Sequence, residues 1–467
     1  MTVSRRQWLG GAASAAVVGS VPVSVWAASD PWAKARAIVA AISAPVIPDY
    51  RVDITDFGAV GDGVTKNTDA IARAIAACVA AGGGHVRVPK GRFLTGAIHL
   101  GGRIDLHLEE GATLLFSTDT ADYPPVFTRW EGVELINYSP LIYAKDVSHV
   151  SVTGKGVLDG QGANERWWSW SSGKRFGWRE GMATQHPARN RLFQMAEDGV
   201  PPEQRVFGDG DYLRPCFVQF YGCDTVKVEG VTLKDAPFWN IHPVLCRNVI
   251  VSGVTVTGHG PNNDGCNPES VDHMLIENCL FDTGDDCIAI KSGRNADGRR
   301  VNVPSQNIVI RNCEMKDGHG GVVIGSEISG GVHHVFAENC RMDSPELWYA
   351  FRFKTNARRG GVLEHFHFRD ITIGEVERSV LICDFNYEEG AKGEFTPVVR
   401  DITIERVTAR KAVRGMDIQG LPHAPVRNVT LRDCRFDGVT EADIVRHASG
   451  IRLKNVTVNG KRHRFLR

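Results

Sequence analysis

Two adjacent carboxylates, Asp285 and Asp286, are the first candidates for acid–base chemistry in this chain. They follow Gly284 and precede the apolar run Cys287–Ile290, which predicts a short buried strand. Neighbouring side chains of an ideal strand point to opposite faces, so both carboxylates reach one cleft only if the backbone turns there. Glycine permits such a turn. For the Asp-Asp pair alone, two solvated aspartates in a surface turn are the simpler interpretation. The residues that neighbouring segments place beside the pair decide between such a turn and a catalytic site.

Four segments can be aligned on a shared polar position, which is Ser270, Ser292, Ser326 or Thr355. The residues six places earlier are Asp264, Asp286, Gly320 and Tyr349, and those seven places earlier are Asn263, Asp285, His319 and Trp348. In a parallel stack of coils, equivalent positions lie about 4.8 Å apart. The alignment therefore predicts that Asp264 lies beside Asp286, and that His319 lies beside Asp285.

The same alignment adds positive charge to this patch. The residues one place before the shared position are Glu269, Lys291, Gly325 and Lys354, and those three places before it are Asn267, Ala289, Val323 and Arg352. Carboxylates held close together raise the pKa of one of them, which is the condition for a general acid beside a general base. Two carboxyl groups of this kind are typical of glycoside hydrolysis, and Arg352 and Lys354 would bind a substrate carboxylate. The alternative is a polar ladder in which the two cations only neutralise the aspartates.

The elements that must position these residues recur along the chain from about residue 140. Each is a short alternating strand, and the spacing is roughly 22–35 residues with no helix-length pattern between the units. The units are 145–152, 223–231, 246–254, 271–278, 305–312, 331–339, 398–404, 426–433 and 451–458. This period predicts an all-β fold, a right-handed parallel β-helix. Leucine-rich repeats lack support because their leucine signature is absent, and a propeller would need four strands in a longer repeat.

The domain organisation follows from these repeats. We expect residues 51–467 to form a single β-helix domain, with a helix over Asn67–Cys78, capped by Asn/Thr, that covers its N-terminal end. The segment 160–212 breaks the rhythm and is predicted to be a long insertion or loop. It contains Trp167, Trp168, Trp170 and Trp178, with Lys174, Arg175 and Arg179. These indoles either flank a sugar-binding cleft or pack the loop onto the body.

The N-terminus is predicted to be an export signal rather than part of the fold. Arg5-Arg6 precede a weakly apolar run and small residues at 27–29, so residues 1–28 are similar to a twin-arginine signal peptide. An uncleaved anchor is the alternative. Residues 29–50 are predicted to be a leader with a short helix over Pro31–Ile42. We therefore expect a bacterial protein that is periplasmic or secreted, with no stable membrane association.

Charge and cysteine content exclude some classes of protein. Lys+Arg and Asp+Glu both total 54, and a neutral chain is not expected to bind nucleic acid or a membrane through a polybasic surface. The eleven cysteines recur in one local context, as in Asn278-Cys279 and Asn312-Cys313. We interpret them as small buried residues of the repeat, although one or two disulfides remain compatible with export.

The motifs together resemble glycoside hydrolase family 28, the polygalacturonases. The residues that carry the resemblance are Asn262-Asn263-Asp264-Gly265, Gly284-Asp285-Asp286, Gly318-His319-Gly320 and Arg352-Phe353-Lys354. The stretch Phe57–Gly63, with Gly82-Gly83-Gly84, resembles the start of pectin-degrading β-helices. The pattern departs from the family at two places, Asn263 in place of Thr and Asn267 in place of a frequent Asp.

The resemblance implies an inverting hydrolase that cuts α-1,4 bonds between galacturonic acids, with no cofactor and no metal. By motif position, Asp285 would be the general acid, Asp264 and Asp286 would activate water, and His319 would orient the acid. Arg352 and Lys354 would hold the galacturonate carboxylate. The further residues predicted to bind substrate are Asn262, Lys291, Tyr387 and Trp239.

The substrate is expected to be a pectic oligosaccharide or polysaccharide, bound by a monomer. The Trp/Arg-rich segment and the expected export favour an exo-acting enzyme that trims imported oligogalacturonides. A rhamnogalacturonan hydrolase is the main alternative. A calcium-dependent pectate lyase and a non-catalytic polysaccharide-binding β-helix are the others.

Overall fold

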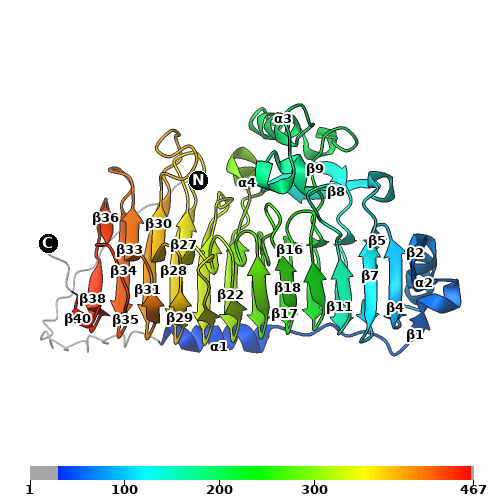
Figure 1. Ribbon diagram of the computed structural model, residues 1–467, viewed down its shortest axis with the longest axis horizontal. Helices are drawn as coiled ribbons and strands as arrows, with labels where there is room; N and C mark the ends of the chain where they lie inside the picture. Colours follow the sequence, from blue (N-terminus) through cyan, green and yellow to red (C-terminus); the bar gives the residue numbers. More distant parts are fainter. Residues whose placement is uncertain (1–29, 464–467) are drawn as a thin grey trace, which may run out of the picture.

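Three parallel sheets run along the molecule and form a right-handed β-helix, which confirms the predicted fold class (Figure 1). The computed structural model describes residues 30–463. The predicted export signal at 1–28 lies outside the described residues. In the part of the chain that the structure describes, no helix is long and apolar enough to cross a membrane.

Sheet A carries the repeats that are most regular in sequence. Its strands are β1 (Arg51–Asp53), β3 (Gly84–Val88), β6 (Ile104–Leu108), β11 (Ser148–Gly154), β14 (Asp224–Glu229), β17 (Arg247–Ser252), β19 (Asp272–Glu277), β22 (Ser305–Arg311), β25 (Val332–Glu338), β28 (Val362–Arg369), β31 (Val398–Glu405), β34 (Val426–Arg432), β37 (Ala448–Ser449) and β38 (Arg452–Lys454). The repeats listed from sequence omit the coil of β28, which carries no Asn-Cys pair at its end.

Sheet B follows each strand of sheet A after a tight turn. Its strands are β2 (Asp62–Lys66), β4 (Gly91–Thr95), β7 (Ala112–Phe116), β12 (Val157–Asp159), β15 (Thr232–Lys234), β18 (Thr255–Gly258), β20 (Leu280–Thr283), β23 (Glu314–Met315), β26 (Arg341–Met342), β29 (Thr372–Glu375), β32 (Thr408–Lys411), β35 (Arg435–Phe436), β39 (Thr457–Val458) and β40 (Lys461–Arg462). All pair in parallel except β40, which runs antiparallel to β39.

Sheet C is divided into two parts. The first contains β5 (Ile98–His99), β10 (Ile142–Lys145), β13 (Val218–Tyr221) and β16 (Ile241–Val244). The second contains β21 (Ile288–Ile290), β24 (Val322–Ile324), β27 (Tyr349–Lys354), β30 (Ser379–Asp384), β33 (Arg414–Gln419) and β36 (Ile444–Arg446). Single bridges from Ile241 to Cys266, and from Cys266 to Ile288, connect the two parts.

The turn from sheet A to sheet B explains the repeated Asn-Cys pairs. Asn278, Asn312 and Asn339 all adopt φ of 55°, a left-handed conformation that Asn tolerates better than most residues. The cysteine that follows each one points into the core. All eleven cysteines are free and buried, as their sequence context predicts.

The core is a ladder of apolar side chains in register. Val226, Val249, Met274, Ile308 and Val335 pair in succession along sheet A, and each is at most 1% exposed. Alternation of apolar and polar residues sends one face of each strand inward, so the stack of coils buries a continuous core.

Helix α2 (Thr68–Ala80) covers the N-terminal end of the solenoid, as predicted (Figure 1). Asn67 precedes it, but its amide side chain bonds Val60 and Leu94 and makes no capping hydrogen bond. The expected Asn cap is therefore wrong in detail, because this side chain joins the first coil to the loop before it.

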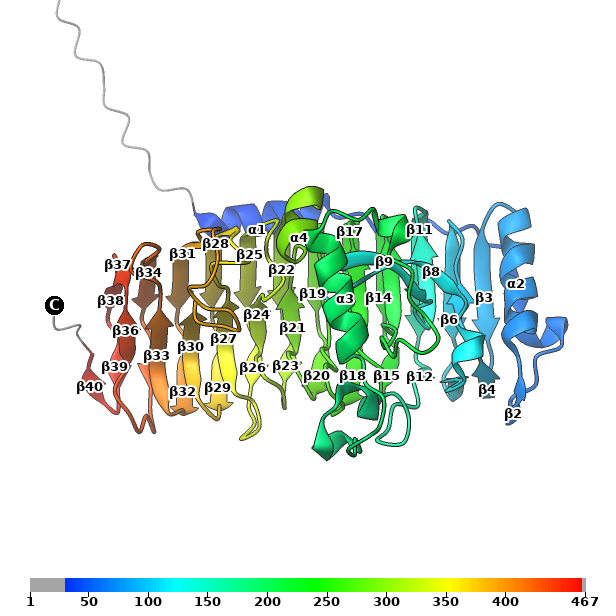
Figure 2. The same ribbon diagram turned by 90° about the horizontal axis from the view of Figure 1, so that it is seen from above.

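Helix α1 (Pro31–Ala41) is the predicted leader helix and lies along the outside of sheet A (Figure 2). Asp30 caps it by accepting a hydrogen bond from the Trp32 amide at 3.0 Å. Its apolar face, Trp32, Ala35 and Ile38, packs on Leu275, Val309 and Phe336.

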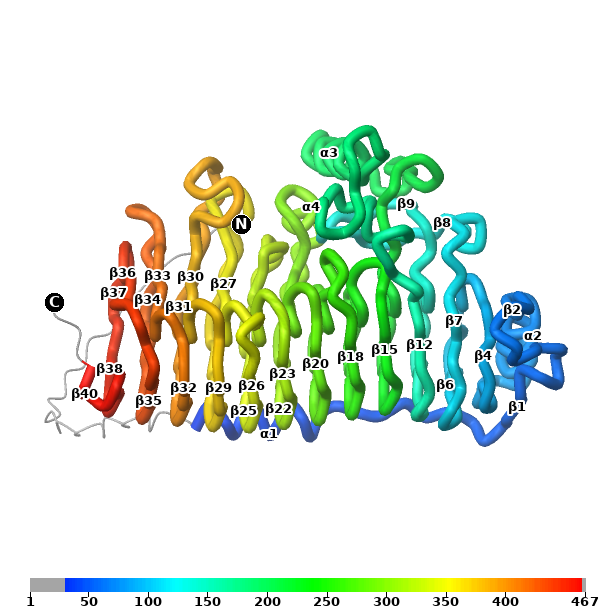
Figure 3. Tube along the Cα trace, viewed as in Figure 1, coloured from blue at the N-terminus to red at the C-terminus, as the bar shows by residue number. Residues whose placement is uncertain are grey.

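The predicted insertion rises from the side of the molecule away from α1 (Figures 1 and 3). It contains η3 (Trp168–Ser171), η4 (Lys174–Phe176), α3 (His186–Glu197) and η5 (Pro202–Gln204). The antiparallel hairpin of β8 (Pro125–Trp130) and β9 (Val133–Tyr138) and the short helix α4 (Asn295–Val301) stand beside it. The remaining short helices are η1 (Ile54–Phe57) and η2 (Thr120–Asp122).

Candidate active site

The strand register places the aligned residues side by side, as the sequence predicts. Glu269 bridges Lys291, and Ala289 pairs with Val323, which pairs with Arg352. In the same register, Asp264 falls opposite Asp286 and Asp285 falls opposite His319. The patch is built from four successive coils, three at the passage from sheet B into sheet C and the fourth in strand β27 of sheet C.

The turn at Gly284 presents both carboxylates to the same site. The Thr283 hydroxyl donates to the Asp285 carbonyl at 2.8 Å and holds the turn. A Cβ on Gly284 would lie 2.4 Å from the Gly260 carbonyl oxygen of the preceding coil. Glycine is therefore required by the close approach of two coils, rather than only by the freedom of a turn.

Asp286 is held by the two predicted cations. Its carboxylate is 2.6 Å from the Lys354 ammonium and 3.4 Å from the Arg352 guanidinium, and the residue is only 1% exposed. Arg352 also donates to the His319 carbonyl at 3.3 Å. Asp286 therefore has a cation on two sides, and the Arg352 cation also ties it to the coil of His319.

Asp285 is paired with His319. The His319 Nδ1 atom lies 2.9 Å from the Asp285 carboxylate. The imidazole ring stacks on Trp348, with ring centroids 3.8 Å apart. Burial works to raise the pKa of Asp285, but the charges of His319, Lys354 and Arg352 outweigh it, so the pKa lies below its usual range.

Asp264 is the third carboxyl group and has the opposite electrostatics. Burial, with the nearby charges of Asp285 and Asp286, raises the pKa of Asp264 well above its usual range. The Asn267 amide donates to it at 2.7 Å, and the Lys291 ammonium lies 3.7 Å away. The sequence predicts one raised carboxyl pKa in the cluster, and in the free protein it belongs to Asp264.

Lys291 and Trp239 form the floor of the site. The Lys291 ammonium lies 4.4 Å from the centre of the Trp239 ring and 3.0 Å from the Glu327 carboxylate. Burial opposes the charge of Lys291, but Glu327 and Asp264 outweigh it and raise its pKa. Lys291 is thus a charged group that already has carboxylate partners.

Tyr387 and Asn262 also reach the site, as predicted. The Tyr387 ring lies 5.5 Å from the Lys354 ammonium and 5.8 Å from the Arg352 guanidinium carbon. Asn262 has φ of 57°, and its side-chain oxygen accepts from the buried Arg214 at 2.7 Å. Burial lowers the pKa of Arg214 to about 9. Arg214 also binds two backbone carbonyls, so it holds the turn before Asp264.

Five charged residues that the sequence analysis missed close one side of the site. Arg189 of α3 pairs with Glu131, between β8 and β9, at 2.7 Å. Arg294, just before α4, lies 3.0 Å from Glu388 in the loop after β30 and 3.3 Å from Glu327. We call Glu131, Arg189, Arg294, Glu327 and Glu388 the charged wall.

The sequence carried a signal for only part of the charged wall. Glu327 directly follows Ser326, and Arg294 stands two places after Ser292. Both therefore lie just after the shared polar positions on which the four segments were aligned. Glu131, Arg189 and Glu388 come from segments outside the repeat, where no periodic pattern points to them.

The charged wall and the aspartates enclose a cavity of about 90 Å³. All predicted site residues except His319 and Arg352 line it, together with the members of the charged wall. Pockets that hold drug-sized ligands measure roughly 300–1,000 Å³. This cavity is therefore too small for a run of sugar units.

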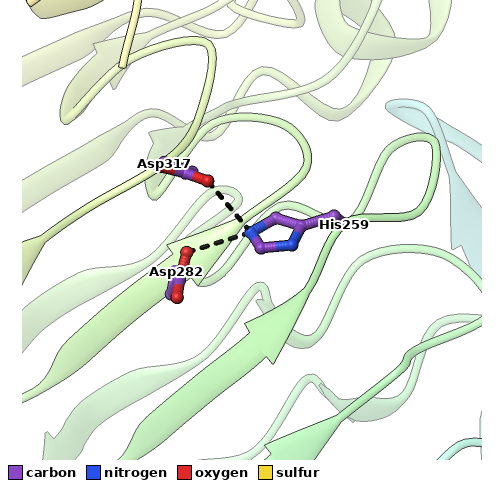
Figure 4. A group of neighbouring side chains, drawn as sticks. All are labelled: His259, Asp282 and Asp317. Atoms are coloured by element: carbon purple, nitrogen blue, oxygen red, sulfur yellow. Dashed lines mark hydrogen bonds and ion pairs between the residues drawn. The ribbon is translucent and has the colours of Figure 1, made fainter. Parts of the chain in front are cut away.

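A second cavity, of about 250 Å³, lies beyond the pair formed by Asp285 and His319. His319 and Trp348 form one part of its lining, and Arg175 and Phe176 of the insertion form another. His259, also in its lining, is 2.9 Å from Asp282 and 3.5 Å from Asp317 (Figure 4). In the described residues, His259, Asp282 and Asp317 form one group that could hold a metal ion, and Glu364, His365 and Asp401 form another.

Residues 209–459 match the sequence profile of glycosyl hydrolases family 28. The chain belongs to this family. The resemblance noted in the motifs is thus confirmed over more than half of the protein, and the chain is a glycoside hydrolase.

Several known members of family 28 align over most of the chain. A hyperthermoactive exopolygalacturonase of Thermotoga maritima is 44% identical with a TM-score of 0.90, over 93% of this chain and 97% of its own. A probable polygalacturonase of Vitis vinifera is 29% identical over 82% of this chain and 74% of its own. An exo-poly-alpha-D-galacturonosidase of Dickeya chrysanthemi is 27% identical over 88% of this chain and 74% of its own.

The indoles of the insertion in this family 28 protein serve mainly for packing. Trp167 is 2% exposed in the main core, and Trp168 donates to the Ala236 carbonyl at 2.9 Å. None of the insertion's four indoles lines either cavity, whereas Trp239 and Trp348 do. The roles of the site residues in catalysis remain predictions.

Proposed function

We propose that the protein is an inverting exo-polygalacturonase, which removes single galacturonates from the ends of α-1,4-linked pectic chains. The observation that carries the proposal is a cluster in which three aspartates, Asp264, Asp285 and Asp286, line one cavity and two cations, Lys354 and Arg352, hold Asp286. Family membership and relatives named as exopolygalacturonases support it.

The reaction follows from the positions of the carboxyl groups. Asp285, paired with His319, donates a proton to the glycosidic oxygen as the carbon–oxygen bond breaks. A water molecule attacks the anomeric carbon from the opposite side and gives its proton to whichever of Asp286 and Asp264 is ionised. With its raised pKa, Asp264 must lose a proton before it can act as this base. A single displacement of this kind inverts the anomeric configuration.

The pKa of Asp285 must rise before this residue can act as the general acid. In the free protein, the charges of His319, Lys354 and Arg352 outweigh burial and keep the pKa of Asp285 below its usual range. A galacturonate carboxylate that binds Arg352 and Lys354 would neutralise them and raise the pKa of Asp285. Asp285 would then take up the proton that it gives to the glycosidic oxygen.

The charged wall supports attack at chain ends. It closes the cavity through the ion pairs Arg189–Glu131 and Arg294–Glu388. A polymer that runs through the site would have to break these pairs, whereas a chain end fits against them. The terminal sugar would occupy this cavity, beside Asp264 and Asp286.

Digestion of polygalacturonate and trigalacturonate in the presence of a chelator tests the proposal. From polygalacturonate we expect saturated monogalacturonate as the only small early product, and from trigalacturonate we expect monogalacturonate with an equal amount of digalacturonate. NMR should show inverted anomeric configuration at the bond that is cut. Mixed oligomers, or viscosity that falls before reducing ends accumulate, would leave a hydrolase but contradict exo action. An unsaturated product that disappears with the chelator would indicate a lyase.

Failure to cleave either substrate would indicate another pectic backbone such as rhamnogalacturonan, or binding without catalysis. Hydrolysis of rhamnogalacturonan by the same preparation would distinguish these two outcomes.

Export to the periplasm or the medium, as a monomer, completes the proposal. It rests on Arg5-Arg6 and the small residues at 27–29. An Arg5→Lys, Arg6→Lys variant should accumulate in the cytoplasm, as measured by cell fractionation. Normal export of this variant would contradict a twin-arginine route.

A further inference from the structure

The second cavity is placed to receive the part of the substrate that leaves. Asp264 and Asp286, which would activate water, line the first cavity, whereas His319 lines the second. In an inverting reaction, water attacks from the side opposite the leaving group. The leaving sugar therefore belongs on the His319 side of Asp285.

The charges around the second cavity are largely paired within the protein. His259 contacts Asp282 and Asp317, and His319 contacts Asp285. Arg378, which stacks on Trp348, lies 3.9 Å from the Glu377 carboxylate. Glu346 lines the cavity as an exposed carboxylate.

Arg175 differs from these groups. Within residues 30–463, no carboxylate lies within ion-pair distance of its guanidinium, which stacks 4.4 Å from the centre of the Phe176 ring. Phe176 packs edge-on against Trp168, at 6.4 Å between ring centres, and Trp168 is bonded to the body of the solenoid. The insertion thus holds an unpaired cation at the wall of the cavity.

We infer that Arg175 of the insertion binds the carboxylate of the galacturonate in the leaving group. The inference rests on the proposed function and extends it, since it assigns to the insertion the recognition of the second sugar. An arginine fork matches a carboxylate in geometry and charge. Phe176 orients the guanidinium by lying beneath it, so Phe176 is a positioning residue.

A pair of substrates separates this role from catalysis. Digalacturonate places a carboxylate in the leaving group, and 4-nitrophenyl α-D-galacturonide does not. We expect Arg175→Gln to lower kcat/KM for digalacturonate about five- to tenfold, mainly through KM, as for loss of one charge-assisted hydrogen bond. Hydrolysis of the nitrophenyl substrate should stay within about twofold of the unaltered protein.

Lys174→Gln is the matched control, because it removes a neighbouring exposed cation that does not line the cavity. The Lys174→Gln variant should hydrolyse both substrates as the unaltered protein does. Equal losses on both substrates, or no loss on digalacturonate, would overturn the role of Arg175. If the unaltered protein cleaves neither substrate, the proposed function itself fails and the inference falls with it.

Discussion

At the scale of single residues, the three aspartates of the site differ in how the protein holds them. Asp286 has two cationic partners, Asp285 has an imidazole, and Asp264 is buried with an amide and a more distant ammonium. These environments push the pKa values of Asp264 and Asp285 in opposite directions. In the free protein these directions are the reverse of the proposed roles, so substrate binding must raise the pKa of Asp285 before it can act as the acid.

Asp285→Asn should abolish most of the activity while the fold is retained. Without the proton donor, kcat on trigalacturonate is expected to fall by about 10³. KM should change little, because Arg352 and Lys354 remain. Steady-state kinetics measures both constants, and Asp146→Asn, an exposed change in a distant turn, is the control. Residual activity above about a tenth would contradict the role of Asp285.

Asp264→Asn should stabilise the protein at pH 7. Because the folded pKa of Asp264 is raised, the unfolded chain releases this proton first, and the cost to folding appears as pH rises above about 4. Asparagine removes that cost, about 1–3 kcal/mol, and still accepts a hydrogen bond from Asn267. Thermal unfolding at pH 7 and pH 4 should show the gain only at pH 7.

Asp286→Asn is the contrasting variant, because it leaves Lys354 and Arg352 without their carboxylate. Its unfolding temperature at pH 7 should fall. A rise for Asp286→Asn, or a fall for Asp264→Asn, would contradict this account of the charges.

At the scale of elements, helix α1 is fixed to sheet A by few contacts. Trp32 packs edge-on against Phe336, at 5.6 Å between ring centres, and the Arg369 guanidinium carbon lies 3.7 Å from the centre of the Trp32 ring. Helix α1 runs along sheet A (Figure 2), whereas the site residues come from sheet C and the turns that lead into it from sheet B. Helix α1 can therefore be tested separately from the active site.

Trp32→Ala should release α1 and leave activity unchanged. Replacing a buried indole by alanine removes about 3–5 kcal/mol of stabilising free energy. A short helix that packs through one face has less than this to lose before it detaches. Limited trypsin digestion should then cut at Lys34 or Arg36, with hydrolysis of trigalacturonate retained. Trp178→Ala is the control in the insertion. Resistance to trypsin in Trp32→Ala would show that α1 is held by other contacts.

At the scale of the whole molecule, segments outside the repeat narrow the cavity that the repeat carries. The solenoid supplies the aspartates from successive coils, whereas Glu131, Arg189 and Glu388 of the charged wall come from three separate segments. The insertion that contains α3 rises above the solenoid (Figure 3). The mode of attack is thus set by insertions, while the chemistry is set by the repeat.

Arg189→Ala should relax the requirement for a chain end. It removes the ion pair with Glu131, and it leaves the aspartates and their cations in place. We expect polygalacturonate viscosity to fall several-fold further, at equal release of reducing ends, than with the unaltered protein. Arg191→Ala on the same helix, which removes an exposed pair with Asp211, is the control. Unchanged product profiles would mean that other members of the charged wall suffice.

Much of the fold and of the catalytic cluster was accessible from the sequence, because both depend on the repeat. Alternating strands and turn residues with left-handed φ recur with each coil, and a parallel stack keeps equivalent positions adjacent. Counting from Ser292 was therefore enough to place Asp285 beside His319. The coil of β28 has the same alternation and a left-handed turn residue, Asp370, so the repeat pattern was also present there.

The sequence by itself determined the β-helix, the position of the aspartates and their cations, and the buried cysteines. Only the tertiary structure decided that the pKa of Asp264 is raised and that of Asp285 is lowered, since burial and neighbouring charges are properties of the folded site. It also decided how Arg189, Glu131 and Glu388 meet, and how Arg175 reaches the second cavity. These residues lie in segments without a period, so their positions depend on packing against distant parts of the chain.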